Sequence, residues 1–183
     1  DIDSPVLFPM VKGRLVKING KEILPEHFAH DLHAERHIRR EFNLSWVSEL
    51  PSDNQVVQGT WWTVNGESKT SMKAEISIEQ SIAKIIGIKL GDELTYDIAG
   101  SHFSAPVTSV RKVNWDSFRV NFFVVTPPGL LENYPLSYIT SFHVPENRMD
   151  MIHALVRAFP NILVIDMAAV INQVQGMIEK VSQ

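Results

Sequence analysis

The feature of this sequence that most constrains its fold is a change of pattern at Pro127-Pro128-Gly129. Before this point, apolar and polar residues alternate in short runs separated by turn residues, which is typical of β-strands. After it, the apolar spacing predicts a strand at 137–144, a helix at 146–159, a short buried strand at 161–165 and a helix at 166–181. The chain is therefore predicted to be α+β, with a switch of architecture near Pro127.

The part before Pro127 is predicted to be rich in strands. A hairpin is expected from Leu7 to Leu24, because Asn19-Gly20 can adopt the two positive φ angles of a type I′ turn. The segment from about Val56 to Thr126 is expected to form a small, strongly bent sheet or a partial barrel. The individual strands predicted here are 41–46, 94–98, 103–112 and 118–126.

One helix is predicted within this strand-rich part, and it is expected to begin at Ser77. Ser77 and Gln80 have the spacing of a capping box, in which each side chain satisfies a backbone donor at the helix start. Gly87 is the predicted C-terminal stop signal. The apolar residues that would share one face of this helix are Ile78, Ile82, Ile85 and Ile86.

The helix predicted at 166–181 is capped by Asp166 and reaches the end of the sequence without a Gly or Pro stop after Lys180. Two interpretations stay open: the helix continues in a longer chain, or it docks on the sheet as a terminal helix. Because the sequence begins at Asp1 and carries no targeting signal, we expect it to be a piece of a longer protein.

The composition excludes several classes of protein. Hydrophobic residues make up 44% of the 183 residues, charged residues 21%, and the formal net charge is −4, which argues against a disordered chain and against a basic, nucleic-acid-binding face. The absence of cysteine excludes disulfides, thiolate catalysis and Cys-based zinc sites. No apolar run approaches the about 20 residues that a membrane-spanning helix needs.

The segment 25–40 is predicted to be an exposed loop or a short, weak helix, and it contains a candidate metal site. On a helix, His30, His33 and His37 would share a face and could bind one zinc ion. Neighbouring positive charge disfavours a cation, so we interpret these histidines as solvated and keep the metal site as an alternative. The residues that supply this charge are Arg36, Arg39 and Arg40.

No motif of an enzyme is present in the sequence. There is no G-x-S-x-G nucleophile elbow, and the glycines have neither the Walker lysine nor the dinucleotide-binding spacing. Ser101, in Gly100-Ser101-His102, lies in a predicted hairpin turn. We therefore predict no catalytic, cofactor-binding or metal-binding residues, and no cofactor.

The tryptophans and one polar segment are the remaining candidates for a site. Trp46, Trp61-Trp62 and Trp115 could form a ligand platform, but packing is the favoured interpretation because large aromatic side chains dominate core energetics. Polar and aromatic residues interrupt two strands at 113–119. This pattern predicts a specific loop that side-chain hydrogen bonds hold in place.

Several unusual runs of the sequence together resemble one protein family, the extracytoplasmic part of ABC transporter permeases of the FtsX/MacB type, and within it the YbbP-like branch. The resemblance extends over essentially all 183 residues. The runs that carry it are VNWDSFRVNFF at 113–123, PPG at 127–129, SYITSF at 137–142, REFNLSW at 40–46, GTWW at 59–62 and GDELTYDIAG at 91–100.

The resemblance implies a fold, known as a MacB-like periplasmic core domain. The whole chain, 1–183, would be one excised extracytoplasmic domain with two lobes. An α/β lobe would be built from both chain ends, 1–50 and 130–183, and a β-rich lobe would be inserted between them at 51–129. This arrangement agrees with the hairpin, the strand-rich middle and the strand–helix–strand–helix pattern predicted from the residues.

The resemblance also implies a function, that of a non-catalytic periplasmic domain of an inner-membrane permease. Its partners would be the flanking transmembrane helices of the same permease, a separate cytoplasmic ATPase subunit and an extracytoplasmic lipid hydrolase. The domain would transmit ATP-driven motion of the membrane helices, with the 166–181 helix as a lever, and the cargo would be a lipid or another lipophilic molecule. Two alternatives are a hydrophobic-ligand carrier using the Trp-lined middle and a metal-binding module.

Overall fold

The computed structural model describes residues 6–64, 73–117, 119–167 and 169–170. The chain divides into two compact units, Asp1–Ser141 and Phe142–Gln183, and each is described by itself. The first unit holds all nine described strands. In chain order they are β1 (Phe8–Ile18), β2 (Lys21–Glu22), β3 (Phe42–Trp46), β4 (Asn54–Gly59), β5 (Ile76–Glu79), β6 (Glu93–Ile98), β7 (Ser101–Val113), β8 (Val124–Thr126) and β9 (Ser137–Ile139).

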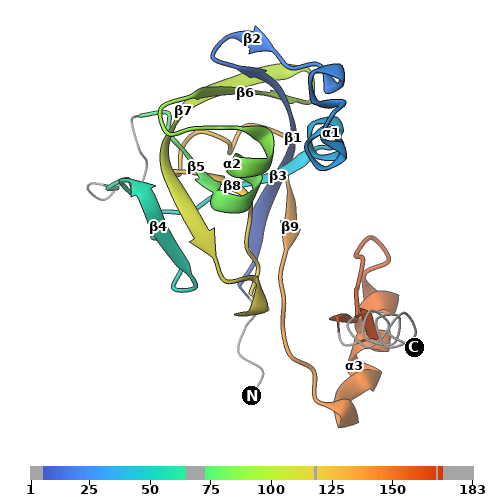
Figure 1. Ribbon diagram of the computed structural model, residues 1–183. Coiled ribbons are helices and arrows are strands. Elements are labelled where there is room, and N and C mark those ends of the chain that lie inside the picture. The colour runs from blue at the N-terminus through green and yellow to red at the C-terminus, as the bar shows by residue number, and fades with distance from the viewer. Residues whose placement is uncertain (1–5, 65–72, 118, 168, 171–183) are drawn as a thin grey trace, which may run out of the picture. The chain divides into compact units, whose positions relative to one another are not determined.

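Six of these strands close into a barrel, in the order β1, β3, β8, β5, β7, β6 and back to β1. The pairs β3–β8 and β5–β7 are parallel, and the other four are antiparallel. The remaining strands are added outside the ring: β2 and β9 pair with β1, and β4 pairs with β7. Figure 1 shows the long β1 and β7 as the two strands that carry these additions.

The helices of the first unit are short and lie beside the barrel. They are η1 (Pro25–Phe28), α1 (Leu32–Arg39), α2 (Gln80–Ile86) and η2 (Trp115–Ser117). Helix α2 contacts β5, β7 and α1, and Figure 1 shows it next to β5 and β8. One continuous core joins the barrel to α1 and α2. Its fully or almost fully buried residues include Val11, Leu44 and Val124 from the strands and Ile38 and Ile82 from the helices.

The predicted hairpin and helix stops are confirmed. β1 and β2 pair around Asn19 and Gly20, whose φ angles are 52° and 75°, as a type I′ turn requires. The Asn19 side chain also binds the Asp92 carboxylate and the Glu93 backbone N–H, which ties this turn to the start of β6. Gly87 ends α2 with a φ of 84°. The segment 25–40 forms short helices, one of the two predicted possibilities.

The predicted helix start at Ser77 is wrong. Ser77 lies in β5, and the helix begins at Gln80 with Glu79 as its N-cap, whose carboxylate accepts from the backbone N–H groups of Ser81 and Ile82. The reason is that β5 pairs with β7 along one edge and with β8 along the other, and all four of its residues are buried. The residues of β5 alternate as in a strand, but the capping-box spacing of Ser77 and Gln80 imitates a helix start.

Two other predicted strands are shorter than expected. Of the strand predicted at 118–126, only β8 (Val124–Thr126) is formed, because side-chain hydrogen bonds hold the residues before it in a loop. Of the strand predicted at 137–144, only β9 (Ser137–Ile139) pairs, with Phe8–Met10 of β1.

The second unit contains η3 (Glu146–Arg148) and α3 (Met149–Ala158), so the helix predicted before Pro160 is confirmed. The strand predicted at 161–165 is wrong: these residues pair with no strand among those described, and Leu163 is 85% exposed. Asp166 accepts a hydrogen bond from the Ala169 N–H, which confirms it as a helix cap. The rest of the predicted terminal helix, 171–181, lies outside the described residues.

The mixed composition of helix and strand is confirmed, whereas the two-lobed arrangement is not. β1 and β3, from residues 1–50, close the same barrel as β5 to β8, from residues 51–129. The predicted partial barrel is therefore a complete one, and it takes strands from outside the segment 56–126. The lobe boundaries at 50 and 130 stay a prediction.

Two glycines with almost the same φ angle provide a test of this packing. A Cβ on Gly59 would lie 2.1 Å from the Thr108 carbonyl oxygen, whereas a Cβ on Gly20 would meet nothing within 4 Å. We expect Gly20→Ala to cost about 1 kcal/mol of unfolding free energy, the strain of a left-handed alanine. Gly59→Ala should cost roughly 2 kcal/mol more, because the β4–β7 pair must move apart. Urea denaturation of both variants measures this difference, and equal losses would contradict the close approach of these strands.

Candidate functional site

The central group of the candidate site is Arg111, a charged side chain in β7 that is only 1% exposed. Its guanidinium donates to the Ser77 hydroxyl at 2.9 Å, to the Asn54 side-chain oxygen, and to the Phe122 and Phe123 carbonyl oxygens at 2.9 and 3.3 Å. Burial lowers the pKa of Arg111 to about 10, and the Glu79 charge opposes this shift. Arg111 is therefore still a cation at neutral pH, and its hydrogen bonds compensate for its loss of water.

The strand register explains why this position can hold a cation. β7 lies between β4 and β5 at this point, where Arg111 is opposite Val56 on one side and Glu79 on the other. Ser77 and Ser109, both fully buried, form a hydrogen bond of 2.7 Å beside it. Ser77, Ser109 and Arg111 thus form a buried polar cluster on these strands, and the guanidinium is its main donor.

A second network is centred on the Asp53 carboxylate, just before β4. One oxygen accepts from the Ser117 hydroxyl at 2.6 Å and from the Asn121 amide at 2.7 Å, and the other accepts from the Asn54 amide at 3.1 Å. Burial raises the pKa of Asp53, but these hydrogen bonds outweigh burial and the pKa is lowered. Asn54 joins the two networks, since it also binds Arg111 and Asn121.

These networks hold the segment between β7 and β8. The Asp53 backbone oxygen accepts from the Asn114 N–H, and the Asn114 side chain accepts from the Asp116 N–H at the start of η2. The loop predicted at 113–119 is therefore confirmed as one that side-chain hydrogen bonds position. Trp115, 44% exposed, projects from it with its ring 5.0 Å from that of Phe123.

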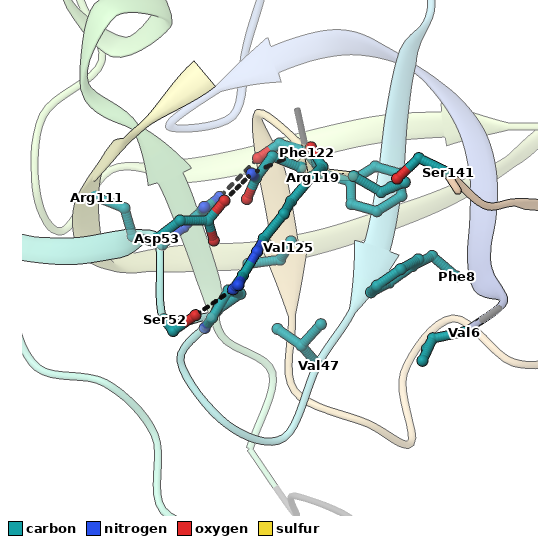
Figure 2. A pocket seen from close by; sticks show the side chains of 13 residues that line it. Val6, Phe8, Val47, Ser52, Asp53, Arg111, Arg119, Phe122, Val125 and Ser141 are labelled. Carbon is teal, nitrogen blue, oxygen red and sulfur yellow. Dashed lines mark hydrogen bonds between the residues drawn. The ribbon is translucent and has the colours of Figure 1, made fainter. Parts of the chain in front are cut away.

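A groove of about 330 Å³ lies against this segment, and Figure 2 shows the side chains around it. Most of its wall is apolar. The apolar lining residues are Val6, Phe8, Val47, Pro51, Val120, Phe122 and Val125. The polar lining residues are Ser52, Asp53, Arg111, Arg119, Asn121 and Ser141.

Arg119 is the exposed cation of this groove. Its guanidinium donates to the Ser52 hydroxyl, and Figure 2 shows the side chain extended toward Ser52, with Asp53 on one side and Val47 and Phe8 on the other. A second groove of about 390 Å³ shares the wall formed by residues 119–122. Its other lining residues include Arg40, Trp115 and His37.

The structure places only two of the three histidines of the alternative metal site on one helix. His30 lies between η1 and α1, while His33 and His37 lie on α1. Burial, helped by the charges of Arg40, His33 and Arg36, lowers the pKa of His37, and its ring packs edge-on against Phe123 at 6.3 Å. Within the described ranges, no three His, Asp or Glu residues are placed to hold one metal ion.

The tryptophans mostly pack, as predicted. The rings of Trp61 and Trp62 stack with centroids 3.9 Å apart, and their indole N–H groups donate to the backbone oxygens of Ser48 and Val47. Trp62 is buried in a small cluster with Phe122 and Val125, outside the main core. Trp46 packs partly buried against the main core. Of the four, only Trp115 lines either groove.

Sequence reasoning missed Arg111, Asp53 and Arg119. The sequence held one signal for Arg111. A charged residue stands inside the strand predicted at 103–112, in the run T-S-V-R-K-V, where Thr and Val favour a strand. Asp53 lies in a stretch, L-P-S-D-N, that is typical of an ordinary loop. Its role depends on residues more than 60 positions later in the chain, which no local pattern reveals.

Comparison with known proteins gives one informative match. Over 167 residues, 91% of its length, the chain is 35% identical to "Uncharacterized ABC transporter permease YbbP" of Escherichia coli (strain K12). The chain is homologous to part of an ABC transporter permease. The predicted resemblance is thereby confirmed, and the chain spans 19% of the length of that permease. No family model and no solved structure matches the chain.

The matched region is about one-fifth of that permease, which agrees with one domain of a larger protein. Among the helices that the structure describes, none is long and apolar enough to cross a bilayer.

The buried guanidinium provides a prediction on stability. Arg111→Met leaves the Asn54 side-chain oxygen and the Phe122 carbonyl without this donor and leaves Ser77 with Ser109 alone, so we expect the unfolding free energy to fall by about 3–5 kcal/mol. Arg119→Gln, which changes an exposed side chain, should cost about 0.5 kcal/mol or less. Guanidinium chloride denaturation compares the two, and an Arg111→Met variant as stable as Arg119→Gln would contradict a stabilising role for the Arg111 hydrogen bonds.

The Asp53 network provides a prediction on pH. Because the pKa of Asp53 in the folded chain lies below its ordinary value of 3.8, its ionised form stabilises the fold at neutral pH. This contribution is lost as the pH falls through 3.8 and then through the folded-state pKa. Asp53→Asn should therefore show a flatter loss of stability in that acid range than the unchanged chain. Thermal melts across this range test it, and parallel pH profiles would contradict it.

Proposed function

We propose that this chain is a non-catalytic extracytoplasmic domain of an ABC transporter permease subunit, which couples ATP-driven movement of transmembrane helices to the handling of a partner or cargo. The observation that carries the proposal is the 35% identity over 91% of the chain to part of a permease. ATP would be hydrolysed by a separate cytoplasmic subunit, and the domain would lie on the periplasmic side of the inner membrane.

The rigidity of the first unit supports a role in transmission. A closed barrel has no free edge within its ring, and the Arg111 side chain connects β4, β5, β7 and the segment that follows η2. Densely packed, hydrogen-bonded elements have low compressibility and therefore transmit displacement. A domain of this kind can pass a movement from one face to another without absorbing it.

The chemistry of the described site supports a non-catalytic role. Asp53 is its acidic group, and both carboxylate oxygens already accept hydrogen bonds from neighbouring side chains. These bonds lower the pKa of Asp53, which makes it a weak base at neutral pH. Its arrangement is that of a group that positions a loop.

The lever in this proposal is the helix predicted at 166–181, which would connect the domain to a transmembrane helix of the same permease. The Asp166 cap supports a helix that begins at this position. An extracytoplasmic lipid hydrolase is the proposed neighbour or partner, and a lipid or lipophilic molecule is the proposed cargo.

The lever can be tested in the complete permease, reconstituted with its ATPase subunit in liposomes. A flexible Gly-Ser insert after Val181 should abolish the transport-linked stimulation of ATP hydrolysis, because a flexible linker does not transmit a displacement. The matched control has the same insert between Gly100 and Ser101, in the exposed β6–β7 turn, and should keep the stimulation. Unchanged stimulation with the insert after Val181 would refute the lever.

A further inference from the structure

The groove beside Arg119 combines an apolar wall with an exposed cation, and neither the homology nor the proposed mechanism assigns it a ligand. We propose that it binds a single-chain amphiphile with an anionic head, the head at Arg119 and the apolar chain along the wall that contains Phe8, Val47 and Val125.

The apolar part of the groove suits a hydrocarbon chain. Phe8 and Val47 are half-buried and pack against the small cluster of Trp62, Phe122 and Val125, so they present a fixed surface. Val6, at the start of the described chain, lines the groove and is 67% exposed. A hydrocarbon chain lying here would cover apolar surface that water now contacts, which is favourable in proportion to the area covered.

The polar part of the groove suits an anionic head. The guanidinium of Arg119 uses one nitrogen to donate to the Ser52 hydroxyl, and its planar fork has further N–H donors. Guanidinium groups bind carboxylates and phosphates through two parallel hydrogen bonds, in a geometry that Lys cannot provide. The head is therefore placed on the outer side of the groove, where Arg119 is exposed.

The charges around the groove favour an anion as well. Asp53 is the acidic residue among those that the structure places in the lining, and its oxygens accept from Ser117, Asn121 and Asn54. The lining also holds two cations, Arg111 and Arg119. With one acid and two cations, the lining has a formal charge of +1, although the net charge of the chain is −4.

The volume limits the ligand to one chain. Small-molecule sites occupy about 300–1,000 Å³, and this groove of about 330 Å³ is at the lower end of that range. A lipid with two acyl chains requires more apolar surface than the seven apolar lining residues offer. A fatty acid or a monoalkyl phosphate fits both the single apolar wall and the single cation.

This inference names a cargo class for the proposed transporter domain, and in that respect it rests on the proposed function. Binding to the isolated chain can be measured without any ATPase, so the two can fail separately. If the chain does not bind the amphiphile, the lever proposal still stands. If the insert after Val181 leaves ATP hydrolysis unchanged, the binding proposal still stands.

The test is a fluorescence titration of the 183-residue chain with a dansyl-labelled undecanoic acid. We expect saturable binding that unlabelled dodecanoic acid and dodecyl phosphate displace, and that dodecanol displaces at least tenfold less well. Arg119→Gln should weaken binding about tenfold or more, because a charge-assisted hydrogen bond to the head is lost. The comparison of dodecanoic acid with dodecyl phosphate shows which head the site prefers.

Two further variants locate the ligand. Arg40→Gln removes a cation from the second groove and should leave the affinity within about twofold of the original. Val47→Trp fills the first groove and should abolish binding while Arg119 is unchanged, which keeps the test decisive if Arg119→Gln does not fold. The methyl NMR signals of Val47, Val120 and Val125 should shift on titration with dodecanoic acid.

Three results would overturn the proposal. They are no saturable binding by the unchanged chain, equal displacement by dodecanol and dodecanoic acid, and a loss of affinity in Arg40→Gln as large as that in Arg119→Gln. The first result removes the site, the second removes the role of the anionic head, and the third places the ligand in the other groove.

Discussion

A single buried cation organises the part of this protein that carries the candidate site. Arg111 has almost no contact with water, so every N–H group that it keeps from solvent needs a partner inside the fold. Its partners come from three separate stretches of chain: Asn54 in β4, Ser77 in β5, and the carbonyl groups of Phe122 and Phe123. Because one rigid group binds all three, the ends of β4 and β5 and the approach to β8 are positioned together.

The groove follows from this arrangement. Its wall includes Phe122 and Val120, which belong to the segment that Arg111 and Asp53 hold. Arg119 lies in the same segment, so its position at the groove depends on the buried network and on its own bond to Ser52. A preorganised cation beside a fixed apolar wall binds with little loss of side-chain freedom, which is why a rigid scaffold suits a binding groove.

Local signals in the sequence predicted the features that depend on neighbouring residues. Asn19-Gly20 was enough for the hairpin, Gly87 for a helix end, and the polar run at 113–119 for a bonded loop. The predictions failed where distant contacts decide. The residues around Ser77 form a strand because β7 and β8 enclose them, and the run at 161–165 has no described partner strand. The groove brings together β1, the loop before β4 and the segment before β8, which meet because β3 pairs with both β1 and β8.

The strand order explains why these groups meet where they do. β7 runs parallel to β5 on one side, and β8 runs antiparallel to it on the other, so the connection 114–123 must cross the carboxyl end of β5. A crossing segment cannot join either ladder, and its buried carbonyl groups need other donors. The Glu79 backbone N–H supplies one to Phe123, and Arg111 supplies those to Phe122 and Phe123. The topology thus creates a need for the buried charge, because an apolar side chain at position 111 would leave the Phe122 carbonyl without this donor, whereas Phe123 would keep the Glu79 N–H.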